Sequence, residues 1–207
     1  MPGKLIVFEG TDGAGLSTQS ALLYKYLKKR GHAVIHTKEP TNDYIGKVIR
    51  SVLRRKKRFC AETLQLLFCA DRAEHIESVI KPALKQNKTV ICDRYIMSTV
   101  AYGALKLDMK WLISLNAKFR RPDMTILLDV PPEVGLKRKF GPGNEDRFEK
   151  EALDFHSKVR DGYLALAAQE PDRWLVIDGT QSKEDIAEII WQKVRQVIRE
   201  KIERNGA

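Results

Sequence analysis

The chain has 207 residues, of which 43% are hydrophobic and 31% are charged, and these proportions exclude an intrinsically disordered protein. No apolar stretch approaches the roughly 20 residues that a membrane-spanning helix needs, so we expect no membrane partner. The length predicts a single domain, residues 1–207, with a sizeable core. The formal net charge of +10 indicates anionic partners, and both nucleotides and nucleic acids qualify.

The basic residues gather in two places, but neither has the pattern of a nucleic-acid site. Arg54–Arg58 is one continuous run, and a second group lies in the C-terminal segment from Lys193 onward. Aromatic residues do not alternate with these charges, as a base-stacking surface would require. Charge runs more often form a solvated face. We therefore expect no nucleic-acid partner, and nucleic-acid binding remains the less favoured alternative.

The cysteines favour a reducing compartment. Cys60, Cys69 and Cys92 are an odd number and form no Cys-x-x-Cys pair, which predicts free thiols rather than a disulfide framework or a zinc site. The chain also enters an apolar run almost at once, without the pattern of a signal segment. We therefore expect a cytoplasmic protein.

In chain order, short apolar runs alternate with longer stretches of helical periodicity. We predict helices over 17–30, which Gly31 would cap, over 61–86, over 150–169 and from 183 onward. The apolar runs are almost uniform, as in strands covered on both faces. We predict strands at 5–8, 33–36, 89–92, 124–130 and 174–177. This alternation predicts a doubly wound α/β domain with five parallel strands.

The first strand runs into the stretch GTDGAGLSTQ, residues 10–19. Its spacing is that of a phosphate-binding P-loop, G-x-x-x-x-G-K-[ST], except that Leu16 stands in the lysine position. Such a loop surrounds phosphate oxygens with backbone N–H groups, and the Ser17 hydroxyl would bind Mg²⁺. A tight strand-to-helix turn that merely needs glycines is the structural alternative.

Two further patterns contain groups that bind nucleotides. Asp93 and Arg94 follow the third apolar run, where a carboxylate can hold Mg²⁺ and an arginine can grip phosphate. The alternative is an ordinary surface ion pair. Phe68 and Arg72 lie four residues apart on one helix face and could form a slot for a base. On the residues alone, we favour a core Phe68 and a solvated Arg72.

Together and in this order, these segments resemble the thymidylate kinase family, from Leu5 to about Ile190. The matching segments are FEGTDGAG with Asp12, KEP at 38–40, LLFCADRAEHIESVIKPAL from 66, DRYIMSTVAYG from 93, LKRKFGPGNEDRFE at 136–149 and VIDGTQSKEDI from 176. The resemblance implies a P-loop NTPase three-layer sandwich with a lid at about 138–148. It further implies ATP and Mg²⁺ as cofactors, dTMP as the substrate, and a homodimer.

The resemblance also assigns site residues. The implied ATP-binding residues are Gly10, Thr11, Asp12, Gly13, Ala14, Gly15, Leu16, Ser17 and Thr18. Those implied for the substrate are Pro40, Phe68, Arg72, Arg94, Ser98 and Tyr102, where Phe68 would stack on thymine and Tyr102 would help exclude a ribose 2′-hydroxyl. The implied catalytic residues are Asp12, Asp93, Arg94 and the lid residues Arg138 and Arg147. Ser17 and Asp93 are the implied metal ligands.

Two positions depart from the family pattern. Gly103 stands where many bacterial relatives have a glutamine near the base, and Leu16 replaces the lysine that neutralises phosphate charge. Loss of one such donor typically costs about 10²–10³ in rate. Arg138, Lys139 and Arg147 could compensate from the lid, whereas Lys4 and Lys38 are poorer candidates.

Three functions follow, and we favour the first. We expect an active dTMP kinase, with a reduced rate if no other cation replaces the lysine. The alternatives are a nucleotide-binding protein with little or no transfer activity, and a kinase for another nucleoside monophosphate or a deoxynucleoside.

Overall fold

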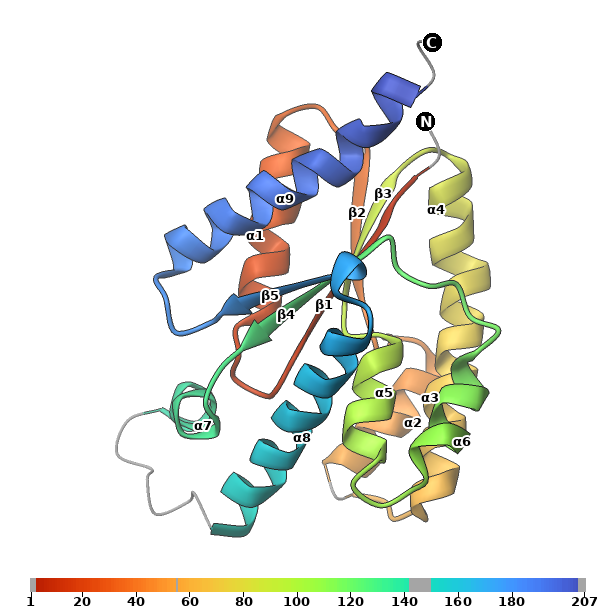
Figure 1. The fold of residues 1–207 in the computed structure, drawn as a ribbon. Coiled ribbons are helices and arrows are strands. Elements are labelled where there is room, and N and C mark those ends of the chain that lie inside the picture. Colours follow the sequence, from red (N-terminus) through yellow and green to blue (C-terminus); the bar gives the residue numbers. More distant parts are fainter. Residues whose placement is uncertain (1–2, 55, 142–149, 205–207) are drawn as a thin grey trace.

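A five-stranded parallel sheet forms the middle layer of the molecule (Figure 1). The structure, a computed structural model, describes residues 3–54, 56–141 and 150–204, but not the side chains of 150–151 and 199–204. The strands are β1 (Leu5–Gly10), β2 (Val34–Lys38), β3 (Thr89–Asp93), β4 (Met124–Asp129) and β5 (Trp174–Asp178). Their order in the sheet is β2-β3-β1-β4-β5, and every neighbouring pair is parallel.

Helices cover both faces of this sheet. They are α1 (Leu16–Lys29), α2 (Tyr44–Leu53), α3 (Ala61–His75), α4 (Lys81–Lys85), α5 (Ile96–Gly103), α6 (Met109–Asn116), α7 (Pro132–Phe140), α8 (Lys150–Gln169) and α9 (Lys183–Arg204). A π-helical turn (Ile76–Ile80) joins α3 to α4, and a 3₁₀ turn (Pro171–Arg173) precedes β5. In Figure 1, α1 and α9 lie on one side of the sheet, while α4, α5 and α8 lie on the other.

Strand β1 shows why this sequence forms three layers. Leu5 and Val7 pack into one core cluster, with residues of α4, α5 and α8. Ile6 and Phe8 point the other way, into a second cluster with residues of α1 and α9. Because side chains alternate along a strand, an all-apolar strand must be covered on both faces.

The fold class is therefore confirmed, with small differences in the bounds of the elements. Each predicted strand is present, with ends that differ from the predicted bounds by one or two residues. The predicted helix over 61–86 is present as α3, the π turn and α4 in direct succession. Gly31 has φ +80° and donates its N–H to the Lys28 carbonyl, so it ends α1 as expected.

Several helices were not predicted, and one of them changes the expected lid. Residues 138–140 belong to the last turn of α7, so the lid segment begins inside a helix. The remainder of the predicted lid, from 142 to 148, lies outside the described residues. Sequence analysis also missed α2, α5 and α6.

The topology brings the predicted motifs to one edge of the sheet. Strands β1 and β3 are neighbours, but the crossover after β1 runs through α1 on one face of the sheet, and the crossover after β3 runs through α5 on the other. Ligands of open α/β sheets bind outside the carboxyl ends of strands at such a point. Gly10 ends β1 and Asp93 ends β3 at this edge. Among the described residues, no helix is long and apolar enough to span a membrane.

Candidate active site

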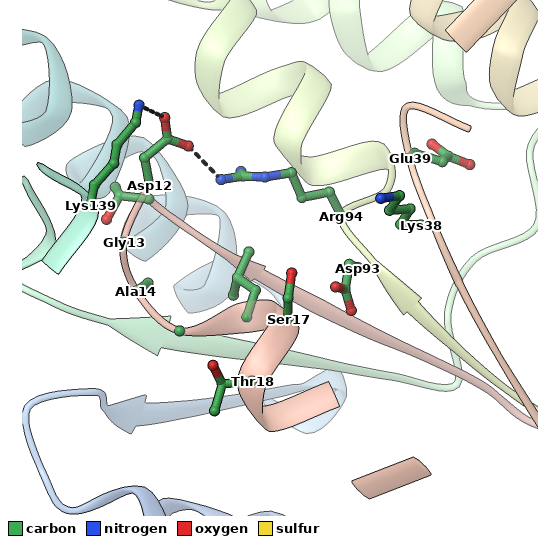
Figure 2. A pocket seen from close by; sticks show the side chains of 13 residues that line it. Asp12, Gly13, Ala14, Ser17, Thr18, Lys38, Glu39, Asp93, Arg94 and Lys139 are labelled. Atoms are coloured by element: carbon green, nitrogen blue, oxygen red, sulfur yellow. Dashed lines mark hydrogen bonds and ion pairs between the residues drawn. The ribbon is translucent and has the colours of Figure 1, made fainter. Parts of the chain in front are cut away.

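A cleft of about 450 Å³ opens at the carboxyl end of β1 and β3. It contains all of the predicted loop from residue 11 to residue 18, together with charged residues from three other segments. Its lining comprises Thr11, Asp12, Gly13, Ala14, Gly15, Leu16, Ser17, Thr18, Lys38, Glu39, Asp93, Arg94 and Lys139. Figure 2 shows this arrangement, with Arg94 and Asp93 across the cleft from the loop.

The loop backbone adopts conformations that require glycine. Gly13 has φ +79° and Gly15 has φ +96°, values in the left-handed region that other residues rarely adopt. Gly15 is followed directly by α1, whose first N–H groups lack partners within the helix. The hydroxyl Oγ1 of Thr11, another residue of the loop, is buried and has no hydrogen-bond partner among the described residues. This loop thus offers several unused donors to an anion.

Leu16, in the lysine position of the motif, packs into the protein core. Its side chain is 8% exposed and belongs to the same cluster as Ala14 and Leu23. A Cβ built on Gly10 would lie 3.3 Å from Leu16 Cδ2, which shows how closely the leucine covers the strand. The leucine therefore contributes to the fold, and its apolar side chain supplies no charge to the cleft.

Asp93 and Ser17 face each other across the base of the cleft (Figure 2). Burial alone would raise the pKa of Asp93, but hydrogen bonds from His36, Ser20 and Ser17 lower it below the ordinary value. The Asp93 Oδ1 atom lies 3.1 Å from His36 Nε2. A carboxylate and a hydroxyl side by side are oxygen donors of the kind that Mg²⁺ prefers. The described residues contain no cluster of three or more His, Cys, Asp or Glu side chains that could hold a metal by themselves.

Arg94 is held in one position by contacts on both of its terminal nitrogens. Its backbone has φ +63°, unusual for a residue other than glycine. One terminal nitrogen donates to the Gly10 carbonyl at 2.9 Å, to Ser98 Oγ at 3.2 Å and to Tyr163 Oη at 3.3 Å. The other donates to Asp12 Oδ1 at 2.8 Å. These contacts fix the position of the guanidinium beside the loop.

Glu9, which sequence analysis did not identify, binds Ser98 and Tyr163, two of the side chains that accept from Arg94. Its carboxylate is fully buried and accepts hydrogen bonds from the Tyr95 and Ser98 N–H groups, at 3.0 and 3.2 Å. Tyr163 Oη and Ser98 Oγ also donate to it. Burial raises the pKa of Glu9, although the Ser98 hydrogen bond and Arg94 oppose the rise. An acidic residue inside the apolar run LIVFEG was the only available signal.

Asp12 joins two cations at the mouth of the cleft. Its Oδ1 accepts from Arg94, and its Oδ2 accepts from Lys139 Nζ at 2.7 Å (Figure 2). Burial would raise the pKa of Asp12, but the charges of Arg94 and Lys139 outweigh burial and lower it. Tyr102 Oη also donates to Asp12, at 3.3 Å, and burial raises the pKa of this tyrosine to about 12.

The predicted base slot contains a deeply buried arginine. Arg72 is 1% exposed and donates from Nε to Glu39 Oε2 at 2.9 Å, and from its terminal nitrogens to Asn116 and to Thr99 Oγ1. The favoured alternative of a solvated Arg72 is therefore wrong. Phe68 is half-buried one turn before it, and Pro40 follows Glu39. The structure places these residues together but does not test contact with a base.

The surroundings of Gly103 account for one of the two departures from the family pattern. A Cβ at this position would lie 2.9 Å from Leu112 Cδ1 and 3.2 Å from Gln65 Cδ. The Gln65 side chain is buried, and its Oε1 has no partner among the described residues. The Leu112 and Gln65 side chains thus fill the space beside Gly103 and leave no room there for a larger residue.

The predicted lid arginines are placed only in part. Arg138 donates to the Gly179 carbonyl at 2.8 Å, in the segment predicted to cover adenine. It is not among the described residues that line the cleft. Arg147 lies outside the described residues.

A parallel sheet whose first strand runs through such a glycine loop into a helix defines the P-loop class of nucleotide-binding proteins. The family model described as thymidylate kinase matches residues 8–190. A thymidylate kinase of Geotalea uraniireducens is 42% identical over 88% of this chain and 92% of its own length. The thymidylate kinase of Thermomicrobium roseum is 43% identical over 94% of this chain and 95% of its own length. A probable thymidylate kinase of Thermococcus onnurineus is 46% identical over 87% of this chain and 92% of its own length. The chain belongs to the thymidylate kinase family.

Proposed function

We propose that this protein transfers the γ-phosphoryl group of ATP to dTMP in the presence of Mg²⁺, giving ADP and dTDP. Family membership supports the substrate and the reaction class. The position of Arg94 carries the proposal, because a fixed guanidinium beside the phosphate loop serves a transfer reaction better than it serves simple binding.

The loop binds the donor nucleotide. Backbone N–H groups between residues 10 and 18 hold its phosphates, and the buried Thr11 hydroxyl, which has no partner in the described part of the chain, adds one more donor. Ser17 and Asp93 hold the magnesium ion, which fits their adjacent oxygen atoms. When bound, this ion neutralises charge on the transferring phosphoryl group.

Arg94 and Asp12 act where donor and acceptor meet. Arg94 bridges the two phosphate groups, and Asp12 orients the acceptor beside it. Because phosphoryl transfer needs little covalent chemistry from the protein, such positioning and charge stabilisation account for most of the catalysis. Glu9, Ser98 and Tyr163 keep Arg94 in place.

The acceptor base lies against α3. Phe68 stacks on thymine, and Arg72 reaches a base oxygen at the edge of its buried network. Pro40, Ser98 and Tyr102 complete this side of the site, with Tyr102 against the sugar. Arg138 and Arg147 act from the lid, and Arg138 must first leave the Gly179 carbonyl.

The first experiment is a coupled ADP-release assay with ATP, Mg²⁺ and each deoxynucleoside monophosphate, run beside the Leu16→Lys variant. Turnover with dTMP at roughly 1–100 s⁻¹ would mean that another cation fully replaces the lysine. Turnover about 10²–10³ lower would mean an uncompensated but active kinase.

A nucleotide-binding protein without transfer activity is the second candidate, and the apolar, buried Leu16 favours it. A silent wild-type protein that Leu16→Lys activates would establish this candidate and overturn the kinase proposal. Turnover with a different monophosphate would instead establish another substrate preference.

We propose a homodimer as the state in solution. Exposed apolar side chains on α2, α3 and α6 support it: Tyr44 is 81% exposed, Leu66 51% and Ile113 45%. Light scattering during gel filtration tests it, and a monomer at micromolar concentration would contradict it.

A further inference from the structure

The helix α7 packs directly on the backbone of the phosphate loop. A Cβ on Gly13 would lie 1.9 Å from the Gly135 carbonyl oxygen, and a Cβ on Gly135 would lie 2.7 Å from the Asp12 carbonyl oxygen. Only glycines on both sides permit this approach. Lys139 follows Gly135 by four residues, so it lies on the same face of the helix, above the loop.

We propose that Lys139 supplies, from α7, the positive charge that the loop lacks at Leu16, and that it contacts the terminal phosphate of the donor nucleotide. Its Nζ lines the cleft and lies 2.7 Å from Asp12 Oδ2, while Arg94 lies 2.8 Å from Oδ1 of the same carboxylate. Two cations thus already converge on one anion beside the loop. When the nucleotide binds, a phosphate oxygen replaces the Asp12 carboxylate as the partner of Lys139. This inference rests on the proposed function.

The charge of the cleft supports a role for Lys139. Among the described residues that line it, Lys38, Arg94 and Lys139 are balanced by Asp12, Glu39 and Asp93. Without Lys139 the lining would have a net negative charge, which opposes the binding of a polyphosphate.

The other cations are less well placed. Lys38 enters from β2 on the opposite side of Arg94 from Lys139 (Figure 2). Arg138 is directed to the Gly179 carbonyl. Arg94 already donates through one nitrogen to Gly10, Ser98 and Tyr163, and through the other to Asp12.

Lys139→Ala tests the proposal, and Lys137→Ala is the matched control because it removes the same charge from an exposed position of the same helix. The first readout is the affinity for a non-hydrolysable ATP analogue and for ADP, measured by calorimetry with Mg²⁺ and without dTMP. We expect Lys139→Ala to weaken analogue binding about tenfold and ADP binding much less, since the contact is to the terminal phosphate.

The second readout is dTMP turnover. We expect kcat to fall about 10²-fold in Lys139→Ala and to change less than about twofold in Lys137→Ala, with Lys139→Arg retaining most of the rate. In the Lys139→Ala background, Leu16→Lys should restore part of the loss.

Several results would overturn the inference. One is equal affinity and turnover in Lys139→Ala and Lys137→Ala. Another is an equal loss of affinity for the ATP analogue and for ADP in Lys139→Ala. A third is a selective loss of affinity for the ATP analogue in Arg138→Ala but not in Lys139→Ala. If the wild-type protein does not phosphorylate dTMP but Lys139→Ala still loses the preference for the ATP analogue, the proposed function fails while the phosphate contact stands. Both lysines are exposed, so the variants should fold, and equal urea midpoints verify this.

Discussion

Arg72 offers the strongest test of the packing beneath the base slot. Replacement of Arg72 by Met keeps an unbranched side chain but removes the donors to Glu39, Thr99 and Asn116. The Arg72 and Glu39 side chains are 1% and 3% exposed, so the glutamate would remain buried without its guanidinium partner. Removal of one member of such a pair costs about 3–5 kcal/mol.

That cost is a large part of the total stability of a domain, which is about 5–15 kcal/mol. With a urea m-value of about 2 kcal/mol/M, the unfolding midpoint of Arg72→Met should fall by roughly 1.5–2.5 M. Arg120→Met is the matched control, because its ion pair with Asp123 has the same length, 2.9 Å, but Arg120 is 41% exposed. The control should lose no more than about 1 kcal/mol.

A double-mutant cycle identifies the partner. Arg72→Met combined with Glu39→Gln should be less destabilised than the sum of the single variants, by about 0.5–3 kcal/mol. A loss below about 1 kcal/mol for Arg72→Met, or additive effects in the cycle, would refute the view that a buried ion pair organises this region. Arg72 would then be free to serve the base alone.

Three further predictions concern the loop and its support. Leu16→Ala should lower the free energy of unfolding by about 2–3 kcal/mol in urea denaturation, since the leucine is buried at the rim of the core; an unchanged midpoint would contradict its role in packing. Gly13→Ala should destabilise the protein and reduce turnover together, because its Cβ would meet Gly135 at 1.9 Å; wild-type values in both assays would show that α7 does not pack on the loop. The pKa of Glu9 is raised in the folded state, so the folded protein holds this proton more tightly than the unfolded chain does. The free energy of unfolding should therefore fall as the pH rises above 4.5, by about 1.4 kcal/mol for each tenfold difference in proton affinity between the two states. Glu9→Gln should abolish this part of the pH dependence above pH 4.5, and an unchanged slope would mean that Glu9 does not contribute to it.

The central sheet could be predicted from sequence because its strands are buried on both faces. Runs such as Leu5–Phe8 have no polar face, and they alternate with helices long enough to show periodicity. Helix α5, with the sequence IMSTVAYG, was missed because it is short and mostly apolar on all sides. In helix α7, the prolines at its N-cap and first position, Pro131 and Pro132, and a run of basic residues concealed the helical pattern.

The site was predictable where a motif follows a strand directly. The loop after β1 and the Asp93-Arg94 pair after β3 were expected at one edge, and the structure places both in one cleft. The partners of Arg72 were not predictable, since Glu39, Thr99 and Asn116 come from three separate segments. The pairing of Lys139 with Asp12 likewise depends on a contact between distant parts of the chain.

The structure separates two roles that the P-loop motif combines. The glycines and the start of α1 shape the proposed phosphate site through backbone atoms, and these are in place with a leucine at position 16. The positive charge of the motif's lysine, by contrast, can come from another segment of the chain, provided that its cation reaches the same phosphate. Burial of Leu16 in the core stabilises the loop from below, whereas a lysine there would have to extend its charge out of an apolar cluster. A sequence of this kind therefore requires its cation on an element packed against the loop, and α7, which meets the loop through Gly13 and Gly135, provides that position.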